Sequence, residues 1–405
     1  MTTKLKSKKV LLMTQYFYPE YVSSAVMPFE TASYLATKGI DVSVLCGYPY
    51  EYSNKMNVPL HENVDNVVID RIKYAGVKRT GVLGRIANYF TFYISILRKI
   101  KQLNGYDVVI VYSDPPILPL LAEQIKKKLR AKVIYVCYDV YPEIGIRTNK
   151  YSERSVFFSV FNYINRKIFK SIDYVVVLSS DMKEYIEKNR NVDGEKIGVI
   201  RNWGKNRKLT NVRSEILSDI NDDTFVVSYL GNMGVCQDVD TIMEAIKNIE
   251  NNGNTCVIFA GHGSKMKDIE KDIHAGNITC VKQFGFLQGE DFDAVLQRSD
   301  AFIFSLIPRM VGLCSPSKVC DYLSSGKPVI FIGDCDIEIA KDIVEYNCGF
   351  QIDNDDCEGV IECIKLLKSN KSMRELMGRN SKKLFNDKYC KELSLPAYRE
   401  IVEKI

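Results

Sequence analysis

The sequence predicts an α/β fold of two doubly wound, Rossmann-like domains that face each other across a cleft. Short, continuously apolar segments alternate with helical patterns along the chain, which is typical of parallel strands covered on both faces. The alternation starts again near residue 224, so two sheets are expected rather than one. The length of 405 residues agrees, because single hydrophobic cores stop growing well below it.

The first sheet begins with the apolar segment KKVLLMTQYF at residues 8–17. A helix is expected at 24–39, where it ends on Gly39, a residue that suits the left-handed turn after a helix. Because later apolar segments are also followed by helix-forming sequence, parallel pairing through crossover helices is expected. The other strands expected in this sheet are 40–47, 107–113, 131–139 and 173–180.

The second sheet begins with TFVVSYLGN at residues 224–232. Before it, residues 197–211 are rich in Asn, Gly and charge and show no periodicity, so the seam between domains is placed there. We expect an N-terminal domain at 1–204, a C-terminal domain at 205–385 and a final helix within 386–405 that packs back towards the N-terminal domain. The remaining strands expected in the second sheet are 254–263, 278–287, 300–306 and 327–334.

The composition favours a reducing compartment. The twelve cysteines include no CxxC pair, and several, such as Cys137 and Cys256, lie inside apolar segments, unlike a disulfide framework or a zinc site. The first residues are charged and lack the apolar segment of a signal peptide. No stretch approaches the roughly 18 apolar residues of a membrane-spanning helix. We expect a cytoplasmic protein, soluble or attached to a membrane from outside.

Charge is unevenly distributed along the chain. Residues 1–204 contain 30 Lys and Arg against 19 Asp and Glu, whereas residues 205–405 contain 25 against 31. Residues 73–106 hold seven cations, no acid and an aromatic cluster at 89–93, and residues 125–132 add five more cations. Such a helix suits an anionic membrane surface, and the alternative is a core helix whose cations stay in solvent. We predict peripheral membrane contact and, without a nucleic-acid reader motif, no nucleic-acid partner.

The stretch GLCSPSKVCDYLSSGKPVI at 312–330 follows an expected strand, so its helix begins where ligands of doubly wound sheets collect. Pro316 and Ser317 are residues that open helices, and a helix N-terminus attracts anions. Lys318 adds a positive charge, and Asp321 follows about one turn later on the same side. The arrangement suits a diphosphate near Lys318 and a ribose diol at Asp321. The alternative is a capped helix with a Lys–Asp pair on solvent.

Two glycine loops also follow expected strands. Glycines there let the backbone approach a phosphate closely, and amide side chains offer neutral donors. The alternative is an ordinary strand-to-helix turn before a helix that starts around Asp238. The loop AGHGSK at 260–265 has the same form, and its His262 is expected to be a loop residue. The candidates in the first loop are Gly231, Asn232, Gly234 and Gln237.

In order and spacing, these motifs resemble the donor domain of retaining glycosyltransferases of family 4, which have the two-domain GT-B architecture. Residues 11–50 are similar to the subgroup that builds capsules, O-antigens and exopolysaccharides. The resemblance covers nearly the whole chain. The segments that carry it in the second half are VIRNW at 199–203, YLGNMGVCQDVDTIMEA at 229–245, VKQFGFLQGEDFDAVLQRSDAFIFSL at 281–306 and SPSKVCDYLSSGKPVI at 315–330.

The resemblance implies a nucleotide-sugar site in the second domain. By this likeness Ser317 and Lys318 bind the diphosphate, Asp321 binds the ribose, and the backbone near Phe286 and Leu287 binds the base, with uracil favoured. The chain also departs from the family pattern. The first of two acids on the last motif falls at Leu313, and the usual Arg and Lys after the first donor strand are Asn232 and Gln237. Lys318 can supply the missing cation.

Catalytic candidates are acids at strand ends of the N-terminal domain. A carboxylate there could accept the acceptor's proton or stabilise a developing oxocarbenium ion, although such acids also occur in turns. No protein nucleophile is assigned. No metal is expected, because the helix terminus and Lys318 neutralise the leaving diphosphate, and DND at 353–355 is expected to be a surface turn. The candidates are Asp139 first, then Glu143, with Glu20 and Asp114 behind them.

We therefore expect a retaining enzyme that moves a hexosyl or N-acetylhexosaminyl group from a nucleotide-diphosphate sugar to a saccharide on a polyprenyl diphosphate lipid. It would act at the inner face of the cell membrane in surface-polysaccharide biosynthesis. A sugar-nucleotide epimerase of the same fold is one alternative, but it needs a histidine in the cleft, and the three histidines occupy no convincing site. A nucleotide-binding scaffold in a polysaccharide assembly complex is the other, and it would explain the missing acid at Leu313.

Overall fold

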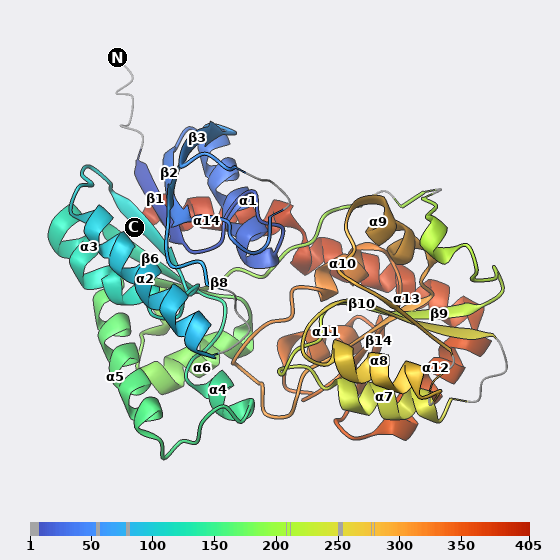
Figure 1. Ribbon diagram of the computed structural model, residues 1–405. Helices are drawn as coiled ribbons and strands as arrows, with labels where there is room; N and C mark the ends of the chain where they lie inside the picture. Colours follow the sequence, from blue (N-terminus) through green and yellow to red (C-terminus); the bar gives the residue numbers. More distant parts are fainter. Residues whose placement is uncertain are drawn as a thin grey trace.

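The computed structural model describes residues 8–53, 57–77, 82–207, 209–210, 212–249, 254–276, 278 and 280–405. Two α/β lobes lie side by side, the N-terminal lobe in blue to green and the C-terminal lobe in yellow to red (Figure 1). Each lobe is built around its own sheet. The prediction of two doubly wound α/β domains is confirmed.

The N-terminal sheet is parallel except at one edge, where the last two strands pair antiparallel. Its central strands are buried along their whole length, as their continuous apolar sequences predict. In spatial order the strands are β3 (His61–Val64), β4 (Val67–Ile72), β2 (Asp41–Gly47), β1 (Lys9–Thr14), β5 (Val108–Tyr112), β6 (Lys132–Cys137), β7 (Tyr174–Val177) and β8 (Ile197–Val199). The helices of this lobe are α1 (Ser23–Thr37), α2 (Val82–Ile100), α3 (Ala122–Leu129), α4 (Glu143–Arg147), α5 (Val156–Ser171) and α6 (Ser180–Arg190).

The C-terminal sheet pairs its strands in parallel. In spatial order they are β11 (Val281–Phe284), β10 (Thr255–His262), β9 (Phe225–Asn232), β12 (Ala301–Ser305), β13 (Val329–Ile332) and β14 (Gly349–Ile352). The helices that follow are α7 (Val239–Lys247), α8 (Met266–His274), α9 (Gly289–Arg298), α10 (Val319–Ser324), α11 (Glu338–Glu345), α12 (Cys357–Ser369), α13 (Lys371–Leu384) and α14 (Lys391–Lys404). Short 3₁₀ turns lie at Leu118–Leu121, Gly194–Lys196 and Glu215–Leu217, and a π-helical turn lies at Phe385–Tyr389.

Strand alternation sorts the helices of the N-terminal lobe onto two faces of its sheet. Val10 and Leu12 of β1 pack in one core with residues of α1 and α14. Leu11 and Met13, which point the other way, pack with residues of α2 and α3. The last helix therefore belongs spatially to the N-terminal lobe, and Figure 1 shows α14, in red, crossing to lie beside α1.

Apolar side chains join the two lobes on one side of the molecule. A single core contains Val140 and Met182 from the N-terminal lobe together with Val319 and the whole C-terminal sheet. The backbone continues the contact, because Val140 N donates to the Leu313 carbonyl at 2.8 Å. This contact fixes the segment that leads into α10 against the N-terminal lobe.

Four strands were not predicted from the sequence, and one predicted boundary is misplaced. The hairpin of β3 and β4 was not predicted, nor was β14. β8 lies inside the predicted seam at 197–211 and is the last strand of the first sheet, so the irregular connection starts only after Val199. These strands have three to six residues and are partly exposed, which leaves too short a pattern to recognise.

Candidate active site

A cavity of about 720 Å³ lies between the two lobes at the carboxyl ends of their strands. It is the place where a doubly wound pair of domains should bind its ligand. The predicted site residues that line this cleft are Asp114, Asp139, Gly231, Asn232, Phe286, Leu287, Ser317, Lys318 and Asp321. Four others lie outside its lining, namely Glu20, Glu143, Gly234 and Gln237.

The segment before α10 is held against the N-terminal lobe. Gly312 N donates to Asp181 Oδ2 at 2.7 Å, and Ser317 Oγ lies 3.3 Å from Ser23 Oγ of α1. The helix itself begins at Val319 and not near Pro316 as predicted, because Cys320 N first closes a turn on the Ser317 carbonyl at 3.2 Å. With only six residues α10 has a small dipole, so the charge of Lys318 is the main attraction for an anion here.

Lys318 is half-buried against the first glycine loop. Its Nζ donates to the Tyr229 hydroxyl and to the Asn232 carbonyl, both at 2.8 Å, and lies 4.2 Å from the centre of the Tyr229 ring. A Cβ on Gly231, whose φ is +127°, would come within 3.4 Å of Lys318 Cε. Burial without a carboxylate partner lowers the pKa of Lys318 to about 7. An anion in the cleft would favour its charged form.

Gly234 and Gln237 shape the glycine loop from behind. Gln237 Oε1 accepts a hydrogen bond from Gly234 N at 2.9 Å, so the side chain that replaces the family's cation is used within the loop. Asp238 accepts from Thr241 N at 3.1 Å and caps α7, which starts where it was expected. Gly231 and Asn232 line the cleft, whereas Gly234 and Gln237 lie behind them in the loop, so the direct contact of these two residues with a donor stays a prediction.

Asp321 faces the cleft in a pair with a residue of the interdomain connection. Arg207 Nε lies 3.3 Å from Asp321 Oδ1, and the same guanidinium also binds Asp293 of α9. Burial raises the pKa of Asp321, and the charge and hydrogen bond of Arg207 act against that rise. One carboxylate oxygen is thus oriented by Arg207, which leaves the other suited to the hydroxyls of a ribose.

Aromatic side chains from both lobes also meet at the cleft. Phe286 is 40% exposed, and its ring stacks on Tyr21 of the N-terminal lobe with centroids 4.9 Å apart. The ring of His262 lies 5.7 Å from Phe286, and burial and Lys318 lower the pKa of that histidine. His262 thus lines the cleft, which the sequence did not predict.

Asp139 lies on the opposite wall, just after β6. Its backbone pairs with Cys314 in an isolated bridge, so it is held directly beside the segment that carries Lys318. Burial, with a smaller contribution from the negative charge of Asp114, raises the pKa of Asp139 to about 7. A carboxylate with such a pKa exchanges protons readily near neutral pH, as a general base must.

The two other predicted acids have structural partners. Glu143 does not reach the cleft: both of its oxygens bind Arg190 Nη2, at 2.7 and 2.6 Å. Glu20 is buried and accepts from Phe17 N at 3.3 Å. The charge of Glu143 thus balances that of Arg190, whose side chain is buried, and the catalytic role of Glu143 stays a prediction that this pairing does not favour.

The site contains residues that sequence reasoning did not select. Trp203 donates its indole N–H to Glu30 of α1, and both side chains line the cleft. Lys205 and Arg207 bring two cations from the connection between lobes. The only signal for them was the basic stretch RNWGKNRK at 201–208, which was interpreted as a linker. Leu313, at the place of the family's first acid, is buried in the core shared by the lobes.

Metal ligation has no visible basis in the part of the chain that the structure describes. No group of three or more His, Cys, Asp or Glu there could hold a metal ion. All twelve cysteines are free. Residues 353–355 form the expected turn, and Asn354 binds Asp238 Oδ2 at 2.6 Å.

Comparison with known proteins identifies the family. Residues 25–203 match the profile of Glycosyltransferase Family 4, and residues 224–370 match that of Glycosyl transferases group 1. The probable glycosyltransferase WbjE of Pseudomonas aeruginosa is 23% identical over 283 residues, which are 69% of this chain and 70% of that protein.

Solved structures share the arrangement of both lobes. WaaG, a glycosyltransferase involved in lipopolysaccharide biosynthesis, has a TM-score of 0.71 and 16% identity, covering 96% of this chain and 98% of its own. Anabaena HepE in complex with UDP-glucose has a TM-score of 0.70 and 12% identity, covering 98% of this chain and 100% of its own. The predicted GT-B fold is confirmed. The chain belongs to the glycosyltransferases, with Glycosyltransferase Family 4 forming its N-terminal half and Glycosyl transferases group 1 its C-terminal half.

Proposed function

We propose that this glycosyltransferase moves a hexosyl or N-acetylhexosaminyl unit, with retention, from a UDP-sugar to a saccharide carried on a polyprenyl diphosphate lipid. The observation that carries the proposal is the single cleft that holds Lys318 and Asp321 on one wall and Asp139 on the other. Support for the donor comes from HepE, which was solved with UDP-glucose. Support for a role in surface-polysaccharide biosynthesis comes from WaaG and from the likeness of residues 11–50 to that subgroup.

The proposed contacts define how the donor lies in the cleft. Its diphosphate lies at Ser317 and Lys318, close to the backbone of Gly231 and Asn232, its ribose at Asp321, and its base near Phe286 and Leu287. Lys318 then gains the anionic partner that it lacks, and it stabilises the charge that develops on the leaving diphosphate. The residues at hand supply this charge without a metal, so we propose metal-independent transfer.

The acceptor approaches from the side of Asp139. In its ionised form this carboxylate accepts the proton of the attacking hydroxyl or stabilises positive charge on the sugar ring. Asp114, which lines the same wall, favours the protonated form of Asp139 and so tunes it towards neutral pH.

We also propose that the N-terminal lobe contacts an anionic membrane through residues 73–106. Of the predicted cations, Lys78 and Arg79 lie outside the described residues. The aromatic cluster is divided: Phe92 is fully buried against the sheet, whereas Phe90 is 56% exposed. None of the helices in the described ranges is long and apolar enough to cross a bilayer.

Binding and turnover test the proposal separately. A thermal-shift panel of UDP-, GDP- and ADP-sugars should show the largest rise in melting temperature with a UDP-sugar, because ligand binding stabilises the native state. Incubation of that sugar with membrane lipid extract should give a glycosylated lipid, in EDTA as well as without it. Binding without transfer or hydrolysis over any extract would favour the scaffold. Conversion of the donor to its epimer without acceptor would favour an epimerase, for which His262 in the cleft is the relevant residue.

A further inference from the structure

The outer side of α5 exposes an apolar stripe that the catalytic cleft does not use. Val156, Val160 and Tyr163 are 81%, 48% and 57% exposed. Their spacing of four and three residues places them on one face of the helix. Exposed cations follow on the same face towards the helix end, at Arg166, Lys167 and Lys170. No acid occurs anywhere in α5.

This stripe lies on the same side of the N-terminal sheet as α2. Val133 of β6 packs in the core of α2 and α3, and Tyr135 and Cys137, two and four residues later, pack with Ile168 of α5. Alternation along a strand puts these three residues on one face of the sheet. α3 contacts both α2 and α5, and Figure 1 shows the three helices covering this side of the lobe.

α2 repeats the pattern of α5. Leu83, Ile86 and Phe90 are 83%, 49% and 56% exposed in its first half, and Arg98 and Lys99 follow at its end. Between the two helices, α3 exposes Lys127 and Lys128. Together α2, α3 and α5 contain nine Lys and Arg and one acid, Glu123. That acid pairs with Lys127 at 2.6 Å.

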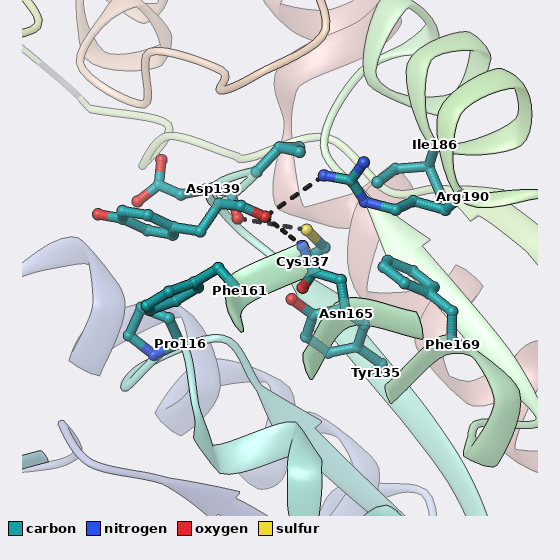
Figure 2. A pocket seen from close by; sticks show the side chains of 11 residues that line it. Pro116, Tyr135, Cys137, Asp139, Phe161, Asn165, Phe169, Ile186 and Arg190 are labelled. Carbon is teal, nitrogen blue, oxygen red and sulfur yellow. Dashed lines mark hydrogen bonds between the residues drawn. The ribbon is translucent and has the colours of Figure 1, made fainter. Parts of the chain in front are cut away.

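The inner side of α5 reaches the side of the cleft that carries Asp139. Phe161, Asn165 and Phe169 line a small pocket together with Asp139, as Figure 2 shows. Asn165 Nδ2 donates to the Tyr141 carbonyl at 2.6 Å, so this side of the helix is fixed to the segment that carries Asp139. One helix, roughly 10 Å across, therefore separates Asp139 from the exposed stripe.

We propose that Val156, Val160 and Tyr163 of α5, together with the exposed stripe of α2, form a two-helix surface that docks on an anionic lipid bilayer. A surface of this kind suits an anionic bilayer, because its apolar side chains can enter the acyl layer while the neighbouring cations contact the acidic headgroups. Val344 of α11 is also exposed, at 63%, but its helix carries three acids, Glu338, Asp342 and Glu345, against one cation, Lys341. The inference rests on the proposed lipid-linked acceptor, which a bilayer under α5 would present beside Asp139.

Co-sedimentation with vesicles tests this surface. We expect Val156→Gln with Val160→Gln to lower the partition of the protein onto phosphatidylglycerol/phosphatidylcholine vesicles by roughly tenfold or more, because two apolar side chains lose their burial. Leu83→Gln with Phe90→Gln should have a similar effect. The matched control, Val344→Gln with Leu366→Gln in the C-terminal lobe, should bind vesicles as the unmodified chain does. All three variants change exposed positions, and a UDP thermal shift checks that the donor site of each is intact.

A spectroscopic readout keeps the test independent of affinity. Tryptophan emission of Val160→Trp should shift to the blue on phosphatidylglycerol vesicles, and that of Val344→Trp should not. Unchanged vesicle binding by the α5 variant, while the α2 variant detaches, would overturn the role of α5 and leave the enzymatic proposal standing. Self-association in sedimentation velocity that the α5 variant alone abolishes would assign the stripe to a second copy of the chain and also overturn it. If the unmodified chain does not bind the donor at all, the result would instead count against the proposed function.

Discussion

At the scale of single residues, Lys318 is a charge for which the proposed diphosphate would be the partner. The ammonium group has a hydroxyl, a carbonyl and an aromatic face around it, all of which solvate it less well than water. Its pKa of about 7 in the unliganded protein reflects that environment. A bound diphosphate favours the charged form and must raise this pKa, so donor binding takes up a proton above neutral pH.

The affinity for UDP should therefore depend on pH. Below pH 7 Lys318 is already charged and affinity is at its maximum; as pH rises through the unliganded pKa, affinity should fall by up to about tenfold per pH unit. Calorimetric titration of UDP between about pH 6 and 9 measures this slope. Lys318→Met should bind UDP more weakly and lose the slope. Lys265→Met, which removes a cation paired with Asp240 outside the cleft, is the control and should keep it.

Asp139 should control turnover rather than donor binding. Its raised pKa of about 7 means that the ionised form grows as pH rises through neutrality, so kcat at saturating donor should rise over the same range. Asp139→Asn should lower kcat by roughly 10²–10⁴-fold, the usual contribution of a general base, with little change in the Kd for UDP. Glu143→Gln should leave kcat near normal and lower the melting temperature, because it unpairs Arg190. Equal losses of kcat in both variants would contradict the assignment.

At the scale of elements, α10 and the interdomain connection act together at the proposed ribose site. Asp321 comes from the helix and Arg207 from the connection, and their pair spans more than one hundred positions of sequence. The sequence predicts Asp321 for the donor site because strand, loop and helix follow one another locally. Only the basic stretch at 201–208 marks Arg207 in the sequence, and its pairing with Asp293 and Asp321 arises when the connection folds over α9 and α10.

Removing Arg207 should weaken recognition of the nucleoside. In Arg207→Gln, burial would act on Asp321 without the opposing charge, its pKa would rise further, and more of the carboxyl would be protonated at neutral pH. We expect roughly tenfold weaker UDP binding, about one pKa unit of interaction, with a larger loss at acidic pH and partial recovery in Arg207→Lys. Pyrophosphate, which lacks the ribose, serves as the control ligand in the same calorimetric titration. Weakening of pyrophosphate and UDP to the same extent would show that Arg207 acts on the diphosphate.

The same scale explains what could be predicted from the sequence. Strands at 8–17, 131–139 and 224–232 were recognisable because both of their faces are buried, which leaves an unbroken apolar segment. The partly exposed β3 and β14 leave no such segment. The catalytic candidates were harder to rank than the donor-site residues, since Asp139 and Glu143 both follow β6 within six residues and only the fold brings Arg190 to Glu143.

At the scale of the whole molecule, the proposed reaction depends on the relative position of the two lobes, because Asp139 and Lys318 come from different ones. Besides the shared core, a polar link joins them: Glu338 of α11 binds Arg201 Nε at 2.6 Å and accepts from Ser180 N at 2.7 Å. Glu338 is nearly buried, and the pKa of its carboxyl is lowered because the hydrogen bonds and charge outweigh its burial. The ionised carboxylate therefore stabilises the assembled lobes above its ordinary pKa, and this contribution is lost as pH falls through the lowered value.

Breaking this link should change the relative position of the two lobes more than the structure of either lobe. Glu338→Gln leaves Arg201 without its counter-charge, so we expect a loss of about 2 kcal/mol in the free energy of unfolding. Transfer should fall more than UDP affinity, because the donor wall lies within one lobe whereas the reaction needs both. Thermal unfolding, small-angle scattering and kcat/KM measured on one preparation test this. Lys341 lies on the same helix and forms an exposed pair with Asp336, which precedes the helix, so Lys341→Gln should change none of the three. A Glu338→Gln enzyme whose UDP affinity falls as far as its kcat/KM would show that α11 supports the donor wall itself, and not the distance between Lys318 and Asp139.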